Sequence, residues 1–274
     1  MKHNLVNLFK SFVLFIFALY QQRFLIMEMT KREVSKQYIG SFLGFFWIFI
    51  NPMLMIFILW FVFSVGLRVR PSGDVPFVIF LTAGMAIWNT FTEAINLSTG
   101  VIASNSHLVK KVVFQLSILP VVKLVGTFVT HSIFLLLLMV LILLYGMPFS
   151  IYWFQALYYF GAMSVLVLGL SWIFSSINVF ARDTGQIVTI ILQFGFWCTP
   201  IFWDIGIMPE KFQFILKLNP MYYIVQGYRE SFIYFVPFWR HLELTIYFWT
   251  IAIFLFITGA LIFRRLRPHF ADVL

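Results

Sequence analysis

The sequence predicts an all-α polytopic membrane protein with about six transmembrane helices, from its composition, its long apolar runs and the placement of its cations. Of the 274 residues, 62% are hydrophobic and 11% are charged, whereas soluble domains carry about 25% charged residues. Several apolar runs approach the roughly 20 residues needed to cross a hydrocarbon core of about 30 Å. The chain has too little polar surface for water, so its solvent is a bilayer.

The segment 1–38 precedes the first apolar run. Lys2 and Lys10 stand before an apolar stretch, as in a signal peptide, but no small-residue cleavage site follows. The chain then mixes apolar and charged residues, which predicts an amphipathic helix in the cytoplasmic interface. We therefore divide the chain into an interfacial segment, 1–38, and a transmembrane domain, 39–274.

Apolar runs bounded by polar residues, glycine or proline define the spans of this domain. They lie near 39–66, 76–98, 116–145, 152–180, 187–203 and 243–263. Pro52 falls inside the first span, and because proline removes a backbone donor we expect a bend or a break there.

The segment 205–240, between the fifth and sixth spans, is too polar to face lipid. A charged side chain in a lipid-facing span costs roughly 2.5–3.5 kcal/mol. The prolines and charged residues of this segment include Pro209, Glu210, Lys211, Pro220, Arg229, Glu230 and Pro237. We predict re-entrant or interfacial gate helices here.

The Lys and Arg residues predict how the chain is oriented in the membrane, because cytoplasmic loops carry more of them than loops on the opposite side. Six spans place thirteen of these cations on the side of both termini and six on the opposite side. Both termini are therefore predicted to be cytoplasmic. A seventh span over 221–239 would bury Arg229 and export the C-terminal arginines. The cations flank apolar runs and form no stripe on a soluble module, so the net charge of +9 does not indicate a nucleic acid partner.

No pattern of catalytic, cofactor-binding or metal-ligating residues stands out. The chain has no G-x-x-x-x-G-K-[ST] phosphate loop. Its five histidines are scattered without metal-ligand spacing, and its ten carboxylates lie mostly in loops. These observations favour a transport subunit over an enzyme.

Several stretches in a fixed order carry a family resemblance. SKQYIGSFLGFFWIFINPML (35–54) resembles the start of the first span in permeases of type 2 ABC exporters, which export O-antigens, capsules and teichoic acids. SNSHLVKKVVFQLSILP (104–120) is similar to their cytoplasmic coupling segment, and INVFARDTGQIV (177–188) to their turn after the fourth span. FWCTPIFW (196–203) and LNPMYYIVQGYRES (218–231) resemble their fifth span and gate helices. The resemblance covers most of the chain.

The resemblance implies the membrane subunit of an ATP-driven exporter in the bacterial inner membrane. The implied substrate is a lipid-linked polysaccharide, first of all O-antigen on polyprenyl pyrophosphate, with capsule or teichoic acid as the alternative. The implied partners are a second copy of the chain and two ATP-binding-cassette subunits, which would bind ATP and Mg; no cofactor is expected on this chain.

Two other function classes stay open at this point. A membrane-embedded glycosyltransferase or acyltransferase would need an acidic or His cluster facing a cavity. An ion-coupled secondary transporter would need ionisable residues near the bilayer midplane. Apart from Glu93, the inner halves of the spans offer almost none.

The implied ATPase-coupling segment has an apolar face that suits a groove on a partner. Its candidate residues are Leu108, Lys110, Lys111, Val112 and Phe114. For the two lysines, positive-inside anchoring is the alternative. Gln115 stands where the family commonly has a proline after the aromatic residue.

Aromatic residues of the first and fifth spans are candidates for the substrate channel. Helical spacing aligns several first-span rings along one stripe, and sugars can lie with their C–H faces on such rings. The candidates are Phe42, Phe45, Phe49, Trp60, Phe194 and Trp197. Packing in the bundle or against lipid is the alternative.

Three cations lie just cytoplasmic of the first span. They are Lys31, Arg32 and Lys36, placed where they could meet the pyrophosphate of a lipid-linked glycan. Positive-inside anchoring is again the alternative.

Overall fold

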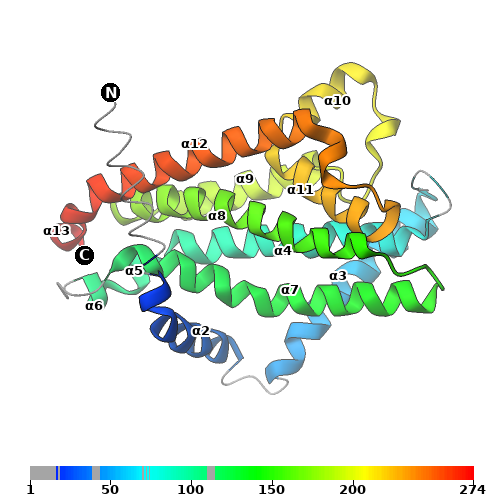
Figure 1. The fold of residues 1–274 in the computed structure, drawn as a ribbon. Helices are drawn as coiled ribbons and strands as arrows, with labels where there is room; N and C mark the ends of the chain where they lie inside the picture. Colours follow the sequence, from blue (N-terminus) through cyan, green and yellow to red (C-terminus); the bar gives the residue numbers. More distant parts are fainter. Residues whose placement is uncertain are drawn as a thin grey trace.

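A computed structural model describes residues 17, 19–38, 44–69, 71, 73, 75–109 and 115–274. These residues form helices joined by short connections, with no β-strand among them. The α-helices are α2 (Arg23–Tyr38), α3 (Trp47–Trp60), α4 (Phe77–Thr99), α5 (Val101–Ser104), α6 (Ser106–Val109), α7 (Leu119–Leu144), α8 (Gln155–Phe180), α9 (Thr184–Cys198), α10 (Glu210–Lys217), α11 (Pro220–Arg229), α12 (Leu242–Leu266) and α13 (Phe270–Val273). Most of the long helices run side by side in one bundle (Figure 1).

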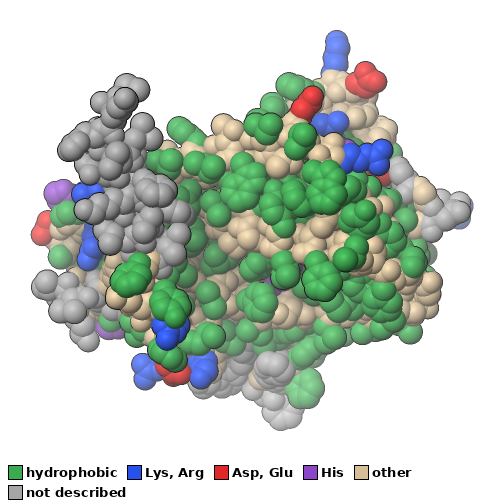
Figure 2. All heavy atoms as spheres, viewed as in Figure 1, with side chains coloured by type: hydrophobic (Ala, Val, Ile, Leu, Met, Phe, Trp, Pro, Cys, Tyr) green, Lys and Arg blue, Asp and Glu red, His purple; other side chains and the backbone are tan. Residues whose placement is uncertain are grey.

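Five helical stretches are long and apolar enough to cross a bilayer. They are Trp47–Gly66, Phe77–Thr99, Leu116–Leu144, Ile151–Phe180 and Phe238–Val273. Hydrophobic side chains cover most of the visible surface of the described residues between its two ends (Figure 2). These features confirm the predicted all-α, multi-pass membrane architecture.

The fifth predicted span is present as the shorter helix α9. Its 15 residues extend about 22 Å at 1.5 Å per residue, less than a hydrocarbon core of about 30 Å. The prediction 187–203 was wrong at its end, because α9 stops at Cys198. Thr199 is extended, with φ −89° and ψ 132°, since the following Pro200 disfavours the helical conformation of the residue before it.

The first span differs from its prediction in another way. Residues 39–43 lie outside the described part of the chain, but α3 continues through Pro52 without a break. Pro52 removes the N–H that would bond to the carbonyl oxygen of Ile48, but the helix is not interrupted there. An irregularity follows later, where Phe61–Gly66 forms a π-helix. The predicted break at Pro52 is therefore wrong, and a bend there stays a prediction.

Helix α4 is the centre of the bundle. It contacts α3, α7, α8, α9 and α11, and 78% of its spanning window is buried, against 22 to 50% for the other four spans. Small residues in its first half, including Ala83, Gly84 and Ala86, are fully buried or in close contact with neighbours. Such residues let membrane helices approach closely.

The pair α8 and α12 makes the closest helix crossing. A Cβ atom on Gly259 would lie 2.2 Å from the carbonyl oxygen of Gly169, and one on Gly169 would lie 2.6 Å from the backbone nitrogen of Phe256. Backbone therefore lies against backbone at this point, and only glycine fits.

Between α9 and α12 the chain forms the two short helices α10 and α11. Helix α10 is mostly exposed, whereas α11 packs against α4, α8 and α12. Gly227 lets α11 approach α8, since a Cβ there would lie 2.1 Å from the Tyr159 ring. The polar segment predicted to contain gate helices therefore folds as one exposed and one buried helix.

Candidate transport pathway

Helices α3 and α9 both pack on α4 and expose much of their own surface. Helix α3 packs on α4 and α7, and α9 packs on α4 and α8. Past the end of α3, the rings of Phe63 and Phe202 lie 4.5 Å apart, so the π-helix meets the connection that follows α9. The two helices are joined at this end of the bundle.

The predicted channel residues of α9 lie on an open surface. The side chain of Phe194 is 70% exposed and that of Trp197 is 58% exposed. Gln186 and Gln193 are also exposed on α9, and spacings of three to four residues place them on the same side as Trp197. This surface is polar near the start of α9 and aromatic near its end.

The predicted stripe on α3 faces the bundle for part of its length. Ile56, which the helical spacing groups with these rings, is buried at 4% exposure. Trp60 is half-buried and lines a groove with Leu137 and Leu141 of α7. Phe49 is half-buried. Phe42 and the side chain of Phe45 lie outside the described residues.

The open face of α3 is the opposite one. It carries Asn51, Leu54 and Ile58, which are all exposed. The two faces could not be told apart from the sequence, since both are mainly apolar and the neighbouring α4 and α7 decide which one is buried.

A polar face on α4 was missed at the sequence level. Asn89, Thr92, Glu93 and Asn96 follow one another at helical spacing. With Leu97, they are the half-buried or exposed members of an otherwise buried stretch. Their three- and four-residue spacing was the signal that could have revealed this face.

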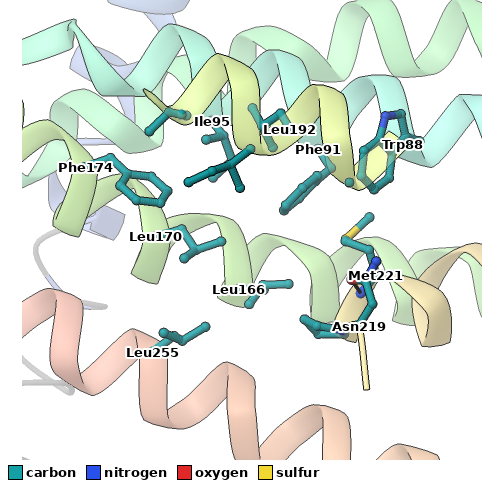
Figure 3. A pocket seen from close by; sticks show the side chains of 14 residues that line it. Trp88, Phe91, Ile95, Leu166, Leu170, Phe174, Leu192, Asn219, Met221 and Leu255 are labelled. Carbon is teal, nitrogen blue, oxygen red and sulfur yellow. Dashed lines mark hydrogen bonds between the residues drawn. The ribbon is translucent and has the colours of Figure 1, made fainter. Parts of the chain in front are cut away.

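An apolar cavity of about 240 Å³ lies behind α9. Side chains of α4, α8, α9 and α12 surround it, and Asn219 and Met221 close one end (Figure 3). Trp88 and Phe91 of α4 contribute its aromatic wall. The cavity lining offers almost no hydrogen-bonding groups, so it suits an acyl chain or empty packing space better than a sugar.

The gate segment contains a fully buried arginine. Arg229 is 1% exposed, and its Nη2 donates a hydrogen bond of 2.6 Å to the carbonyl oxygen of Ile201. The guanidinium also lies over the ring of Phe80, 3.5 Å from its centroid. Arg229 therefore joins α11 to both α4 and the connection after α9. The sequence prediction that this charge avoids lipid agrees with its burial inside protein.

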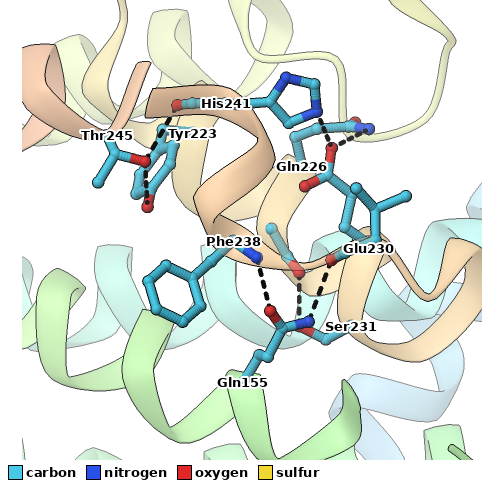
Figure 4. A network of polar contacts seen from close by, with 10 residues as sticks. Gln155, Tyr223, Gln226, Glu230, Ser231, Phe238, His241 and Thr245 are labelled. Carbon is cyan, nitrogen blue, oxygen red and sulfur yellow. Dashed lines mark hydrogen bonds and ion pairs between the residues drawn. The ribbon is translucent and has the colours of Figure 1, made fainter. Parts of the chain in front are cut away.

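A polar network ties the end of this segment to α8 and α12 (Figure 4). Gln155 of α8 donates to the carbonyl oxygen of Val236 at 3.1 Å and accepts from the Phe238 backbone N–H at 2.6 Å. Glu230 is 3.3 Å from His241 Nε2. Burial raises the pKa of Glu230, and the neighbouring His241 partly offsets that rise.

The predicted coupling segment is only partly described. Leu108 lies on α6, half-buried against a cluster that includes Val101, Ile102 and Phe270. The other candidates, Lys110, Lys111, Val112 and Phe114, lie outside the described residues. The position of Leu108 shows that this end of the segment is anchored to the chain's own core.

The predicted lipid-pyrophosphate cations lie on α2, which packs against α7. Lys31 is 3.1 Å from Glu28 with its side chain 72% exposed, and Arg32 is exposed. The Lys36 side chain lies outside the described part. Glu33, on the same helix, forms an ion pair with Lys123 of α7, which fixes α2 to the bundle.

Comparison with known families decides what kind of membrane protein this is. The family model described as ABC-2 type transporter matches residues 25–233. The chain belongs to this family. The matched region includes most of α2, all of α3, α4 and α9, and the buried Arg229.

Curated relatives are similar over most of their length. An O-antigen export system permease protein RfbA from Klebsiella pneumoniae is 28% identical over 91% of this chain and 95% of its own length. A protein of the same name from Myxococcus xanthus is 30% identical over 78% of this chain and 82% of its own. The polysialic acid transport protein KpsM of Escherichia coli is 24% identical over 77% and 81%. The chain is thus a transport subunit of the permease type.

Proposed function

We propose that this chain is the membrane-spanning subunit of an ATP-driven exporter that moves a lipid-linked polysaccharide across the bacterial inner membrane. The observation that carries the proposal is the end-to-end similarity to an O-antigen export permease, over 91% of this chain and 95% of that protein. The proposed substrate is O-antigen on polyprenyl pyrophosphate. The weaker similarity to a polysialic acid transport protein makes a capsule-type polymer the second candidate.

A second copy of the chain is the proposed partner within the membrane. The open surfaces of α3 and α9 carry large side chains such as Phe61, Phe194 and Trp197 at more than half exposure. Two-fold pairing of such surfaces would enclose a pathway between copies. The aromatic candidates on α9 would then face the moving polymer.

Two ATP-binding subunits are the proposed partners on the cytoplasmic side, and ATP and Mg would bind to them. They would engage the segment from Leu108 to Phe114. In the proposed six-span arrangement, both termini lie on the same side of the membrane as this segment, in the cytoplasm. Exposed Lys31 and Arg32 on α2, together with Lys36, would attract the lipid pyrophosphate by charge-assisted hydrogen bonds. ATP binding would then shift an equilibrium between closed and open pathway states.

Disruption of the gene tests this proposal. We expect surface polysaccharide to disappear while lipid-linked polymer accumulates inside the cell, because synthesis continues without export. Restoring the unaltered gene should restore the surface polymer. A transferase would give another result, since the polymer itself, inside and outside, would be shortened or absent. Unchanged surface polysaccharide would refute the proposal.

A further inference from the structure

Polar side chains of α4 and α9 lie side by side within the membrane region, where Thr189 Oγ1 donates to Asn96 Oδ1. We call the set Asn89, Thr92, Glu93 and Asn96 of α4, with Thr189 and Gln193 of α9, the polar furrow. Along α4 these positions cover about 10 Å at 1.5 Å per residue. Phe91, Ala94 and Ile95, on the other sides of the same turns, are buried.

Two neighbouring helices bond to this polar face of α4. Thr130 of α7 donates from Oγ1 to Glu93 Oε1 at 3.4 Å. Thr189 of α9 donates from Oγ1 to Asn96 Oδ1 at 3.4 Å. Both neighbouring helices therefore present hydroxyl groups to the polar face.

Two contacts of the first span with α4 lie at the start of α4. The groove between α3 and α4 is lined by Ile56 and Trp60 of α3 and by Val78 of α4, and beyond α3 the ring of Phe63 stacks 6.4 Å from that of Phe77. Both contacts are more than two helical turns from Asn89. Farther along α4, Asn96 is exposed, whereas Asn89, Thr92 and Glu93 are half-buried.

Two of the furrow amides lack partners within the described part of the chain. Asn89 and Gln193 make no side-chain hydrogen bond there, and Gln193 is exposed. Unsatisfied polar groups facing hydrocarbon cost several kcal/mol each, and polar residues within spans commonly line a functional path. The furrow therefore faces water or a polar ligand.

We propose that the polar furrow is a contact site for the hydroxyl groups of the exported glycan, an inference that rests on the function proposed above. Amide and hydroxyl side chains both donate and accept hydrogen bonds, as sugar hydroxyls do. Such neutral contacts are individually weak, which lets successive sugars exchange along the furrow. The aromatic end of α9, at Trp197, continues the same surface.

A second copy of the chain is the other candidate occupant of the polar furrow. Polar side chains such as Asn also hydrogen-bond across membrane helices. The labelling experiment below separates this occupant from the glycan.

The charge of the furrow narrows the glycan class to uncharged sugars. Glu93 is the ionisable residue among its members. The cations nearest in sequence to Thr130 and Thr189 each lie seven residues before them: Lys123, which is paired with Glu33 of α2, and Arg182. A polymer with a negative charge on every repeat would lose its hydration here without gaining a cationic partner, which is unfavourable.

Paired threonine variants test the contact role. Thr189→Val in the furrow and Thr250→Val on α12 remove the same hydroxyl from an exposed helix position, and each hydroxyl also bonds the carbonyl four residues earlier. We expect Thr189→Val to lower glycan export roughly threefold, the effect of one net hydrogen bond, and Asn96→Leu with Gln193→Leu to lower it further. Thr250→Val should export normally. Equal export by the two threonine variants at equal protein level would overturn the proposal.

Cysteine labelling separates this inference from the proposed function. In a Cys198→Ser background, Asn96→Cys and Gln193→Cys should react with a membrane-impermeant thiol reagent. The reaction should slow when the complex is stalled with glycan, compared with cells that make none. If gene disruption abolishes export but glycan changes neither labelling rate, the furrow inference fails and the exporter proposal stands. Spontaneous disulfides between copies at these positions would instead assign the furrow to the dimer interface and overturn the inference.

The polymer that disappears from the surface after gene disruption tests the charge argument. Its composition should be uncharged sugars. A carboxylate or phosphate on every repeat would overturn the assignment of the glycan class.

Discussion

Substituting alanine for Gly169 probes the packing that holds α8 against α12. The added Cβ would lie 2.6 Å from the Phe256 nitrogen and 2.7 Å from the Leu255 carbonyl carbon, about 1 Å closer than ordinary van der Waals contact. Both neighbours are backbone atoms, so the helices themselves must separate. Overpacking of this kind costs about 1–3 kcal/mol, which outweighs the gain of up to about 1 kcal/mol from replacing glycine by alanine in a helix.

Gly161→Ala is the matched control on the same helix. A Cβ at Gly161 would meet nothing within 4 Å, so this variant should be as stable as the parent or slightly more stable. The assay is thermal unfolding in detergent, followed by size-exclusion chromatography. We expect a lower midpoint for Gly169→Ala and an unchanged or higher one for Gly161→Ala. Equal midpoints would refute the reasoning that backbone contact fixes this crossing.

Three further outcomes are expected. Arg229→Met should lower the thermal midpoint by an amount equivalent to about 1.5–3 kcal/mol, because it removes a charged donor from the Ile201 carbonyl. A rise in the midpoint would show that the cost of burying the charge exceeds the stabilisation from its contacts. Trp197→Ala should reduce export of long glycans at unchanged protein level, and Trp239→Ala, equally 58% exposed, should not; equal losses would make Trp197 a packing residue. Burial raises the pKa of Glu230, so the folded state holds a proton that the unfolded state releases. Stability should therefore fall as the pH rises from the ordinary carboxyl pKa to the raised pKa of Glu230. His241→Ala should extend that fall to higher pH, and a thermal midpoint that rises with pH over this range would contradict the argument.

The spans were predictable because bilayer thickness leaves a strong signal in composition. Runs such as 116–145 and 152–180 match helices to within one residue, since each lies between polar or Gly/Pro punctuation. The end of α9 was missed because apolar residues continue past Cys198, while Pro200 stops the helix. A break at Pro52 was wrongly expected, because α3 continues through the proline despite its missing N–H.

The pathway was less predictable, because hydrophobicity does not say which side of a membrane helix meets protein. The stripe containing Trp60 was as apolar as the face that carries Ile58, and contacts with α7 bury part of the former. The polar positions on α4 had helical spacing in the sequence. Their exposure depends on which residues of α4 are covered by α7 and α9. A local sequence pattern does not predict this packing.

Site-specific photo-crosslinking tests the central claim most directly. A benzophenone side chain is placed at residue 189 in the furrow or at residue 250 on α12, both exposed positions, in cells that make the glycan. Illumination should give protein bearing covalently attached polysaccharide from position 189 and none from position 250. Equal attachment at both positions, or attachment at residue 250 alone, would contradict passage of the glycan along the polar furrow.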